Sequence, residues 1–205
     1  MRQVLFIPCK PFAYAKTRLA GVLAPRARQD LARALYVRTL DVLARCRAGF
    51  EPIVISSDPE VLALARQSGF GTVVEAQARG INPALGSAMT LLGRNKHLRY
   101  AYVPIDLPKL CADDLDDLVA IEHNEVVIAP DLALQGTNFL SWPSTLQFVP
   151  SFGAASFATH CAQALQPGSR LRLYDAPALR RDLDLPDDLW RDAPALMSNR
   201  HQPAT

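Results

Sequence analysis

The sequence predicts an α/β fold in three layers, in which helices cover both faces of a mostly parallel sheet. Short apolar runs alternate with amphipathic helical patterns up to Pro130, which is typical of parallel strands joined by crossover helices. After Pro130 the rhythm changes, and turn residues between short apolar segments predict a small antiparallel excursion. The length of 205 residues suits one hydrophobic core, so we expect a single domain over residues 1–205.

Five strands are expected before Pro130, each a short apolar run of the kind that parallel sheets bury. They cover residues 4–7, 52–56, 72–74, 100–105 and 126–129. The helices between them begin at recognisable signals: Pro25 suits a first turn, and Asp58 and Asn82 each precede a proline as expected N-caps. A further helix is expected through Leu115 and Val119.

The later elements are expected to be shorter. Residues 139–142 and 147–149 are expected to pair as antiparallel strands, and a helix should follow over residues 153–165. The last stretch predicts a strand from Leu171, a turn, a short helix after Pro186 and a frayed polar tail.

Composition restricts the class of protein. The formal net charge of +2 is too small to favour nucleic acid as an electrostatic partner. The chain shows no secretory signal pattern and no apolar run long enough to span a membrane. The four cysteines lack the short spacings of zinc or redox motifs. We therefore expect a cytoplasmic protein without nucleic-acid or membrane partners, and the oligomeric state stays open with a homodimer as the candidate assembly.

In open parallel sheets, ligands bind beyond the carboxyl ends of the strands, so the loops after the strands are the candidate sites. The first loop, residues 8–19, carries Lys10, Lys16 and Arg18. These cations suit nucleotide phosphates, because lysine supplies a point charge and arginine a two-pronged donor. The loop lacks the glycine pattern of a P-loop, and a solvated basic loop is the alternative interpretation.

Carboxylates come from two separate places. Asp106 follows an apolar strand, and Asp182 and Asp184 alternate along an extended segment so that both face one side. Magnesium prefers one or two carboxylates together with phosphate oxygens. We therefore expect Mg²⁺ as the cofactor, with Asp106, Asp184 and Asp182 as candidate ligands. The alternative is that these residues cap the turns before Pro108 and Pro186.

Helix starts supply further candidates, because their N–H groups attract anions. Gly80 and Asn82 stand at one such start and are candidate nucleotide-binding residues, with simple capping by Asn82 as the alternative. The small residues Gly153 and Ser156 near another start, and Thr137 in the preceding turn, would let backbone and hydroxyl donors approach a phosphate or carboxylate closely.

No protein nucleophile is evident in the sequence. His160 lies one helical turn beyond Ser156, where a structural hydrogen bond is the simpler interpretation. A phosphate monoester is already ionised near neutral pH, since its second pKa is about 6. A phosphate acceptor therefore needs positioning and charge neutralisation more than it needs a general base.

These loops together resemble the 2-phospho-L-lactate guanylyltransferase family. The matching stretches are IPCKPFAYAKTRL (7–19), VPIDLPKL (103–110), GTN (136–138), FGAASFATH (152–160) and DLDLPDDL (182–189). The resemblance implies a nucleotide-diphospho-sugar transferase fold, GTP as donor and pyrophosphate as leaving group, in deazaflavin coenzyme biosynthesis. It implies 2-phospho-L-lactate, phosphoenolpyruvate or 3-phospho-D-glycerate as acceptor, held by Thr137, Gly153 and Ser156, with Lys16, Arg18 and Asp106 as the catalytic residues.

Two features depart from that family. Ala155 stands where a second glycine is usual, and residues 132–134 are apolar where polar residues are usual, which bears on acceptor identity more than on reaction type. Other classes also stay open. A glycosyltransferase of similar fold would need two metal-binding aspartates close in sequence, which Asp106-Leu107-Pro108 does not supply, and a non-catalytic nucleotide sensor would not need two carboxylate sources.

Overall fold

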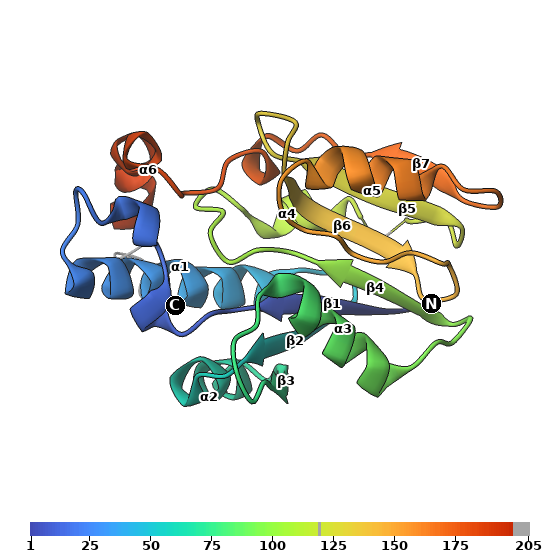
Figure 1. Cartoon of the computed structure of the whole chain (residues 1–205), viewed down its shortest axis with the longest axis horizontal. Coiled ribbons are helices and arrows are strands. Elements are labelled where there is room, and N and C mark those ends of the chain that lie inside the picture. Colours follow the sequence, from blue (N-terminus) through green and yellow to red (C-terminus); the bar gives the residue numbers. More distant parts are fainter. Residues whose placement is uncertain (119, 199–205) are drawn as a thin grey trace.

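The computed structural model describes residues 1–118 and 120–198, with side chains described up to residue 192, and has the expected three layers (Figure 1). One seven-stranded sheet has the strand order β3-β2-β1-β4-β6-β5-β7. The strands are β1 (Arg2–Pro8), β2 (Phe50–Ser56), β3 (Gly71–Val74), β4 (Leu98–Tyr102), β5 (Glu125–Pro130), β6 (Thr137–Pro143) and β7 (Arg170–Leu173). Within the described residues every pairing is parallel except the two that β6 makes with β4 and β5.

Helices cover both faces of the sheet. The described elements are α1 (Pro25–Arg45), α2 (Pro59–Gln67), α3 (Ile81–Leu92), α4 (Ala112–Asp116), α5 (Ser156–Ala164), α6 (Pro186–Ser198) and the 3-10 turns η1 (Phe12–Tyr14), η2 (Thr17–Leu19) and η3 (Pro177–Leu179). Because strand side chains alternate between faces, Leu5 and Ile7 of β1 join a core with α1, α2 and α4, whereas Val4 and Phe6 join a second core with α3 and α5.

Two of the three predicted helix starts are confirmed. Pro25 is the first residue of α1, and the Asp58 carboxylate caps α2 by accepting a 2.9 Å hydrogen bond from the N–H of Glu60. The prediction that Asn82 caps α3 is wrong. Gly80 precedes that helix with φ of 100°, a conformation that favours glycine, and the Asn82 side chain bonds to a different segment described below.

The antiparallel part of the sheet is larger and more central than the predicted excursion. β6 has seven residues, all buried, and it lies between β4 and β5. Apolar residues serve both of its faces, since Phe139 belongs to one core while Leu140 and Trp142 belong to the other. Residues 147–149 form no strand, and the partners of β6 are instead β4 and β5.

Several boundaries differ from the predicted ones. β4 ends at Tyr102 and α4 at Asp116, and Val119, expected in that helix, lies outside the described residues. α5 begins at Ser156, three residues after Gly153, and α6 continues to Ser198 before the undescribed residues 199–205. All four cysteines are free thiols. No helix among the described residues is long and apolar enough to cross a membrane.

Candidate active site

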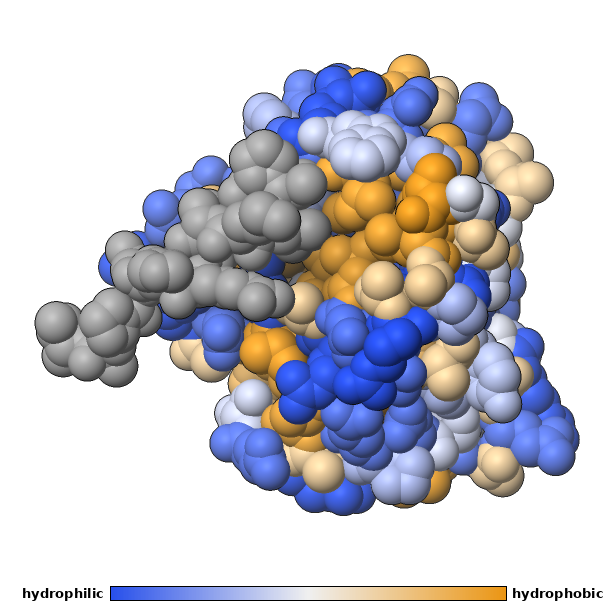
Figure 2. All heavy atoms as spheres, turned by 90° about the vertical axis from the view of Figure 1, so that its left-hand side faces the viewer, coloured by the Kyte–Doolittle hydropathy of each residue, from blue (hydrophilic) through white to orange (hydrophobic). Residues whose placement is uncertain are grey.

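A cleft of about 590 Å³ lies at the edge where the parallel strands end. Figure 2 looks onto this edge of the molecule and shows apolar side chains gathered in its middle with hydrophilic residues around them. The cleft residues come from the loops after β1, β3 and β4, from α1 and α3, and from the C-terminal segment. They include Lys10, Lys16, Arg18, Glu75, Gly80, Ile81, Tyr102, Asp106 and Asp184.

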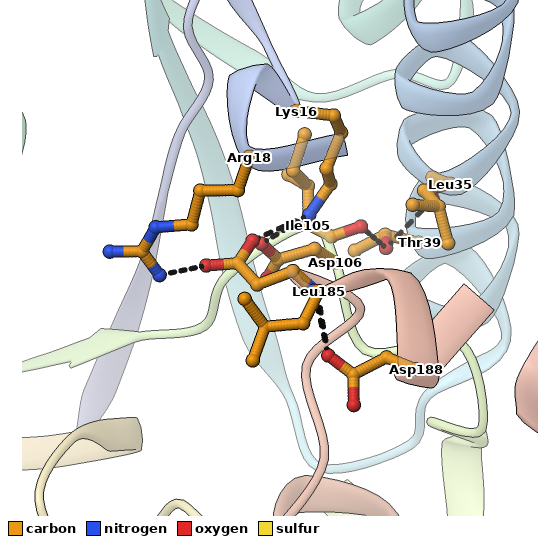
Figure 3. A network of polar contacts seen from close by, with 9 residues as sticks. Lys16, Arg18, Leu35, Thr39, Ile105, Asp106, Leu185 and Asp188 are labelled. Atoms are coloured by element: carbon orange, nitrogen blue, oxygen red, sulfur yellow. Dashed lines mark hydrogen bonds and ion pairs between the residues drawn. The ribbon is translucent and has the colours of Figure 1, made fainter. Parts of the chain in front are cut away.

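Ion pairs join the basic loop to both carboxylate sources. The Lys16 ammonium lies 2.8 Å from Asp106 Oδ2 and 3.1 Å from Asp184 Oδ1, and the Arg18 guanidinium lies 3.0 Å from Asp184 Oδ2 (Figure 3). Only 5% of the Lys16 side chain is exposed, whereas 70% of the Arg18 side chain is exposed. The arrangement places one buried and one accessible cation beside two carboxylates, one from the middle of the chain and one from its C-terminal part.

The local fold holds Lys16 in place. Lys16 has φ of 53° and ψ of 37°, in the left-handed region that costs a residue with a side chain roughly 1–2 kcal/mol. This turn is anchored on both sides, because Phe12 of η1 and Leu19 of η2 are buried. Backbone strain of this kind gathers at functional sites, where the surrounding packing maintains it.

Hydrogen bonds hold the two carboxylate segments against each other. The N–H of Leu183 donates to the backbone carbonyl of Asp106 at 2.9 Å, which ties the C-terminal segment to the loop after β4. The Asp188 carboxylate accepts from the N–H groups of Asp184 and Leu185, as Figure 3 shows for Leu185. Thr39 of α1 donates from its hydroxyl to the carbonyl of Leu35 or Ile105. Residues remote in sequence thus converge on one point.

Charge and burial shift the pKa of two groups in this cluster. Burial alone would lower the pKa of Lys16, but the carboxylates of Asp106 and Asp184 outweigh it and raise that pKa, so the ammonium stays protonated. Burial, together with the charges of Asp106 and Asp184, raises the pKa of Asp182 to about 6.

Cys9 also lines the cleft but does not act as a nucleophile. Burial raises the pKa of its thiol, so the thiol stays protonated and is not the reactive thiolate.

The two carboxylates beside Lys16 are a donor set that fits a magnesium ion. Oxygens of Asp106 and Asp184 already flank a single cationic nitrogen, and magnesium commonly takes one or two carboxylates and completes its shell with phosphate oxygens and water. No group of three His, Cys, Asp or Glu side chains forms a ready metal cage within the described residues. A metal here would therefore depend on its nucleotide for the remaining ligands.

The glycine of the G-T-N stretch allows the Asp131 carboxylate to approach the backbone closely. The N–H of Gly136 donates to Asp131 Oδ2 at 2.8 Å, and a Cβ at this glycine would lie 2.7 Å from the same oxygen. Asn138 donates to the carbonyl of Leu179 and is buried. These contacts fix the start of β6 and therefore the position of Thr137.

His160 sets the hydrogen-bonding role of Thr137. The backbone N–H of Ser151 donates to His160 Nε2 at 2.9 Å, so that nitrogen carries no proton, and the neutral ring must carry its proton on Nδ1. Nδ1 lies 2.9 Å from the hydroxyl oxygen of Thr137 and donates to it. The Thr137 hydroxyl can then donate its own hydrogen elsewhere, which suits an anionic ligand.

The segment before α5 is shaped by left-handed residues. Gly153 has φ of 140°, which only glycine adopts readily, and Ala155 has φ of 57°. Ser156 is 2% exposed, and its hydroxyl has no hydrogen-bond partner within the described part of the chain. The Ser156 hydroxyl is therefore available to hydrogen-bond a ligand.

Asn82 links the nucleotide side of the cleft to this segment. Its amide donates to the carbonyl of Phe152 at 2.9 Å and accepts from the N–H of Phe152 at 2.8 Å. The centroid of the Phe152 ring lies 4.3 Å from that of Tyr102, which lines the cleft, and 4.9 Å from that of the His160 ring. Phe152 thus connects the cleft with the Thr137 and Ser156 region.

The predicted site residues therefore fall into two groups. Residues of the first group line the cleft: Lys10, Lys16, Arg18, Gly80, Asp106 and Asp184. The second group surrounds Phe152 and His160 outside the cleft lining: Asn82, Thr137, Gly153 and Ser156. Asp182 belongs to neither group, but it lies near enough to Asp106 and Asp184 for their charges to raise its pKa. Sequence reasoning missed Tyr102, Glu75 and Asp131, because apolar runs and isolated acidic residues carry no distinguishing motif.

The neutral state of His160 predicts a pH-dependent stability. Burial lowers its pKa to about 4 from 6.5, so between these values the unfolded chain binds more protons than the folded chain. The free energy of unfolding is therefore expected to fall by about 3 kcal/mol from this residue as the pH drops from 6.5 to 4. Urea unfolding across this range checks the slope.

The variant His160→Gln should lose this contribution to the slope, because glutamine does not titrate. His123→Gln, at an exposed histidine, is the matched control and should keep the wild-type slope. Identical slopes for wild type and His160→Gln would show that His160 is not a buried neutral group.

The chain is similar in sequence to named guanylyltransferases over most of its length. It is 35% identical over 195 residues to "Phosphoenolpyruvate guanylyltransferase" of Sphaerobacter thermophilus, covering 92% of this chain and 91% of that one. It is 32% identical to "3-phospho-D-glycerate guanylyltransferase" of Phenylobacterium zucineum (85% and 82% covered). It is also 32% identical to "2-phospho-L-lactate guanylyltransferase" of Methanothermobacter thermautotrophicus (92% and 83% covered).

The fold is shared with solved nucleotide-diphospho-sugar transferases. A putative member from Desulfovibrio desulfuricans G20 superposes with a TM-score of 0.67 at 14% identity, covering 97% of this chain and 95% of that one. The predicted fold class is therefore confirmed. The family model described as "Guanylyl transferase CofC like" matches residues 3–192, which includes both groups of site residues, and the chain accordingly belongs to this family of guanylyltransferases.

Proposed function

We propose that this protein transfers GMP from GTP to a phosphorylated three-carbon acid and releases pyrophosphate, as a step in deazaflavin coenzyme biosynthesis in the cytoplasm. The observation that carries the proposal is the Lys16 ion pair with both Asp106 and Asp184 at the carboxyl edge of the sheet. It unites the basic loop and the two carboxylate sources at one point. The names of the relatives given above state phosphoenolpyruvate, 3-phospho-D-glycerate or 2-phospho-L-lactate as the substrate.

In the proposed reaction an oxygen of the acceptor phosphate attacks the α-phosphorus of GTP. A new P–O bond forms, the bond between the α-phosphorus and the bridging oxygen breaks, and pyrophosphate leaves with the bonding electrons. Lys16 and Arg18 bind the triphosphate and neutralise charge that builds on the leaving group. Magnesium, when bound by Asp106 and Asp184, supplies further charge neutralisation and orientation. No protein base is required, since the acceptor phosphate is ionised.

The acceptor is proposed to lie against Thr137, Gly153 and Ser156. No arginine or lysine is among the hydrogen-bond partners of these residues within the described chain. Hydroxyl groups, backbone N–H groups and the metal would therefore hold the anion. The proximity of Phe152 to Tyr102 supports an acceptor beside the nucleotide cleft.

The direct test uses purified protein, GTP, Mg²⁺ and each of the three acids, with pyrophosphate release as the measurement. One acid should give turnover well above the others and above GTP alone. A chain that releases no pyrophosphate with any of them would not have the proposed function. GTP binding without turnover would favour a nucleotide sensor.

Ser156→Ala and Thr137→Ala are expected to raise the KM for the acid about tenfold while changing the KM for GTP little. Each removes one hydrogen bond to an anion, which is worth roughly 1.5–3 kcal/mol at most. Steady-state kinetics with the two substrates varied separately checks this. Thr90→Ala, at an exposed threonine of α3, is the control. Equal impairment for GTP and acid would argue against an acceptor site at Ser156.

Ala155→Gly is expected to stabilise the protein by up to about 1 kcal/mol and to shift preference among the three acids. The left-handed backbone at Ala155 costs a residue with a side chain roughly 1–2 kcal/mol, and the greater freedom of glycine in the unfolded chain offsets part of the gain. Thermal unfolding and the ratio of kcat/KM values for the acids are the measurements. A variant less stable than wild type would contradict the strain argument.

A further inference from the structure

Three acidic residues line the cleft. Asp106 and Asp184 belong to the ion-pair cluster with Lys16 and Arg18, and Glu75 lies outside that cluster. It follows β3 directly, and its N–H donates to the carbonyl of Ser56 at 2.9 Å, which continues the β2–β3 ladder and fixes its backbone. Its carboxylate makes no ion pair or side-chain hydrogen bond within the described part of the chain. Partial burial raises its pKa. The mechanism above does not use this group.

Glu75 lines the cleft beside β3, the edge strand of the sheet. β3, which precedes Glu75, and β4, which precedes Asp106, are three places apart in the sheet order. At about 4.8 Å per strand spacing, this separates the carboxylate from the phosphate-binding cluster by a span of roughly 14 Å. A nucleotide with its phosphates at Lys16 and Arg18 can extend along the sheet edge so that its base reaches β3. The cleft residues on this side include the small or apolar Ala78, Gly80 and Ile81, which suit the face of a purine.

We infer that Glu75 reads the base of the donor nucleotide by accepting two hydrogen bonds from guanine. This inference rests on the proposed function in taking the nucleotide of the cleft to be a guanine nucleotide. An ionised carboxylate only accepts hydrogen bonds and has two oxygens side by side. Guanine presents two adjacent donors on its Watson–Crick edge, N1–H and the 2-amino group, and so matches the carboxylate in both geometry and polarity.

Adenine does not match this carboxylate. Its N1 is an acceptor that would face a carboxylate oxygen, and it has no 2-amino group. A site built to hydrogen-bond a particular group rejects analogues that lack it, because its own polar atoms are left unpaired. Hypoxanthine keeps N1–H and loses only the 2-amino group, so inosine triphosphate isolates one of the two proposed contacts.

The test is equilibrium binding of GTP, ITP and ATP with Mg²⁺ and without any acceptor, measured by calorimetry. Wild type should bind GTP about tenfold or more tightly than ITP, and ITP more tightly than ATP. In Glu75→Gln, an amide N–H group replaces one accepting oxygen, so GTP affinity should fall to about that of ITP, while ATP affinity should rise because the amide N–H can donate to adenine N1. Glu75→Asp should keep the order with a smaller ratio. Glu51→Gln, at the opposite end of the strands, is the matched control and breaks only a surface pair with Arg2.

An unchanged GTP to ITP ratio in Glu75→Gln would overturn the inference, as would a wild type that binds GTP and ITP equally. If Glu75→Gln does not fold, the wild-type ratio and Glu75→Asp still decide. Because no acceptor is present, the result is independent of turnover. Glu75-dependent GTP binding without pyrophosphate release would leave this inference standing and remove the proposed function. Pyrophosphate release from GTP by a protein that binds GTP and ITP equally would do the reverse.

Discussion

Asp106→Asn is expected to lower turnover with GTP by about a hundredfold or more, on the order of 3 kcal/mol of transition-state stabilisation. The substitution keeps the shape of the side chain but removes a negative charge. In the proposed site that charge holds magnesium together with Asp184, and it also pairs with Lys16 at 2.8 Å. The apparent affinity for Mg²⁺ in the turnover assay should fall as well. Pyrophosphate release at several Mg²⁺ concentrations measures both effects.

Asp30→Asn is the matched control for this prediction. Asp30 pairs with Arg26 on the exposed surface of α1, where ion pairs contribute about 0–1 kcal/mol, so its loss should leave turnover within about twofold of wild type. Unfolding curves should show that Asp106→Asn is folded. A folded Asp106→Asn variant with wild-type turnover and Mg²⁺ dependence would remove Asp106 from the site.

Lys16→Ala is expected to lower kcat/KM for GTP by about a hundredfold, because it removes a nearly buried cation that contacts the phosphates in the proposed complex. It should also destabilise the metal-free protein by about 1–3 kcal/mol. The carboxylates of Asp106 and Asp184 then face each other without the ammonium that bridges them, and only Asp184 keeps a cation partner, the exposed Arg18. Their partial exposure of 22% and 33% keeps this cost below that of breaking a fully buried pair.

Magnesium should rescue part of the lost stability of Lys16→Ala. A cation that binds only the folded state raises the melting temperature, and in the variant it no longer competes with the Lys16 ammonium. The Mg²⁺-induced rise in melting temperature should therefore be larger for Lys16→Ala than for wild type. Thermal unfolding with and without Mg²⁺ measures this. The absence of any Mg²⁺ effect in both proteins would count against a metal between the two carboxylates.

Arg18 is the natural comparison with Lys16. Its side chain is mostly exposed, so Arg18→Ala should change the free energy of unfolding by less than about 1 kcal/mol while still weakening GTP use. Arg18→Lys should also be impaired, because lysine lacks the planar fork of donors. Wild-type kinetics for GTP in all three variants of Lys16 and Arg18 would mean that the loop is only a solvated basic surface.

The sequence was most informative where local signals and global fold agree. The alternation of apolar runs with helical patterns predicted the parallel strands, since central strands such as β4 and β5 are buried on both faces and parallel neighbours need a crossover connection between them. Asp58 and Pro25 predicted helix starts because capping depends on immediate neighbours. The same argument predicted Asn82 as an N-cap and was wrong there, because the Asn82 amide hydrogen-bonds to Phe152, 70 residues away in the sequence.

The place of β6 in the sheet also could not be predicted from local signals. An apolar strand after a turn is compatible with a marginal hairpin or with a central position, and only pairing with both β4 and β5 decides between them. The same insertion positions Thr137 beside His160. Since strand order is set by packing between remote segments, no periodicity in the sequence encodes it directly.

The sequence by itself determined the fold class, the family resemblance and the candidate residues Lys16, Arg18, Asp106 and Asp184, because each stands at a loop that a parallel sheet must bring to one edge. Only the tertiary structure decided which of these side chains meet. It pairs Lys16 with both carboxylates, leaves Asp182 without an ion pair within the described residues, and directs Asn82 to Phe152. Such contacts depend on side-chain directions and on packing between segments far apart in the chain. Those are properties of the assembled core, which spacing along the sequence does not specify.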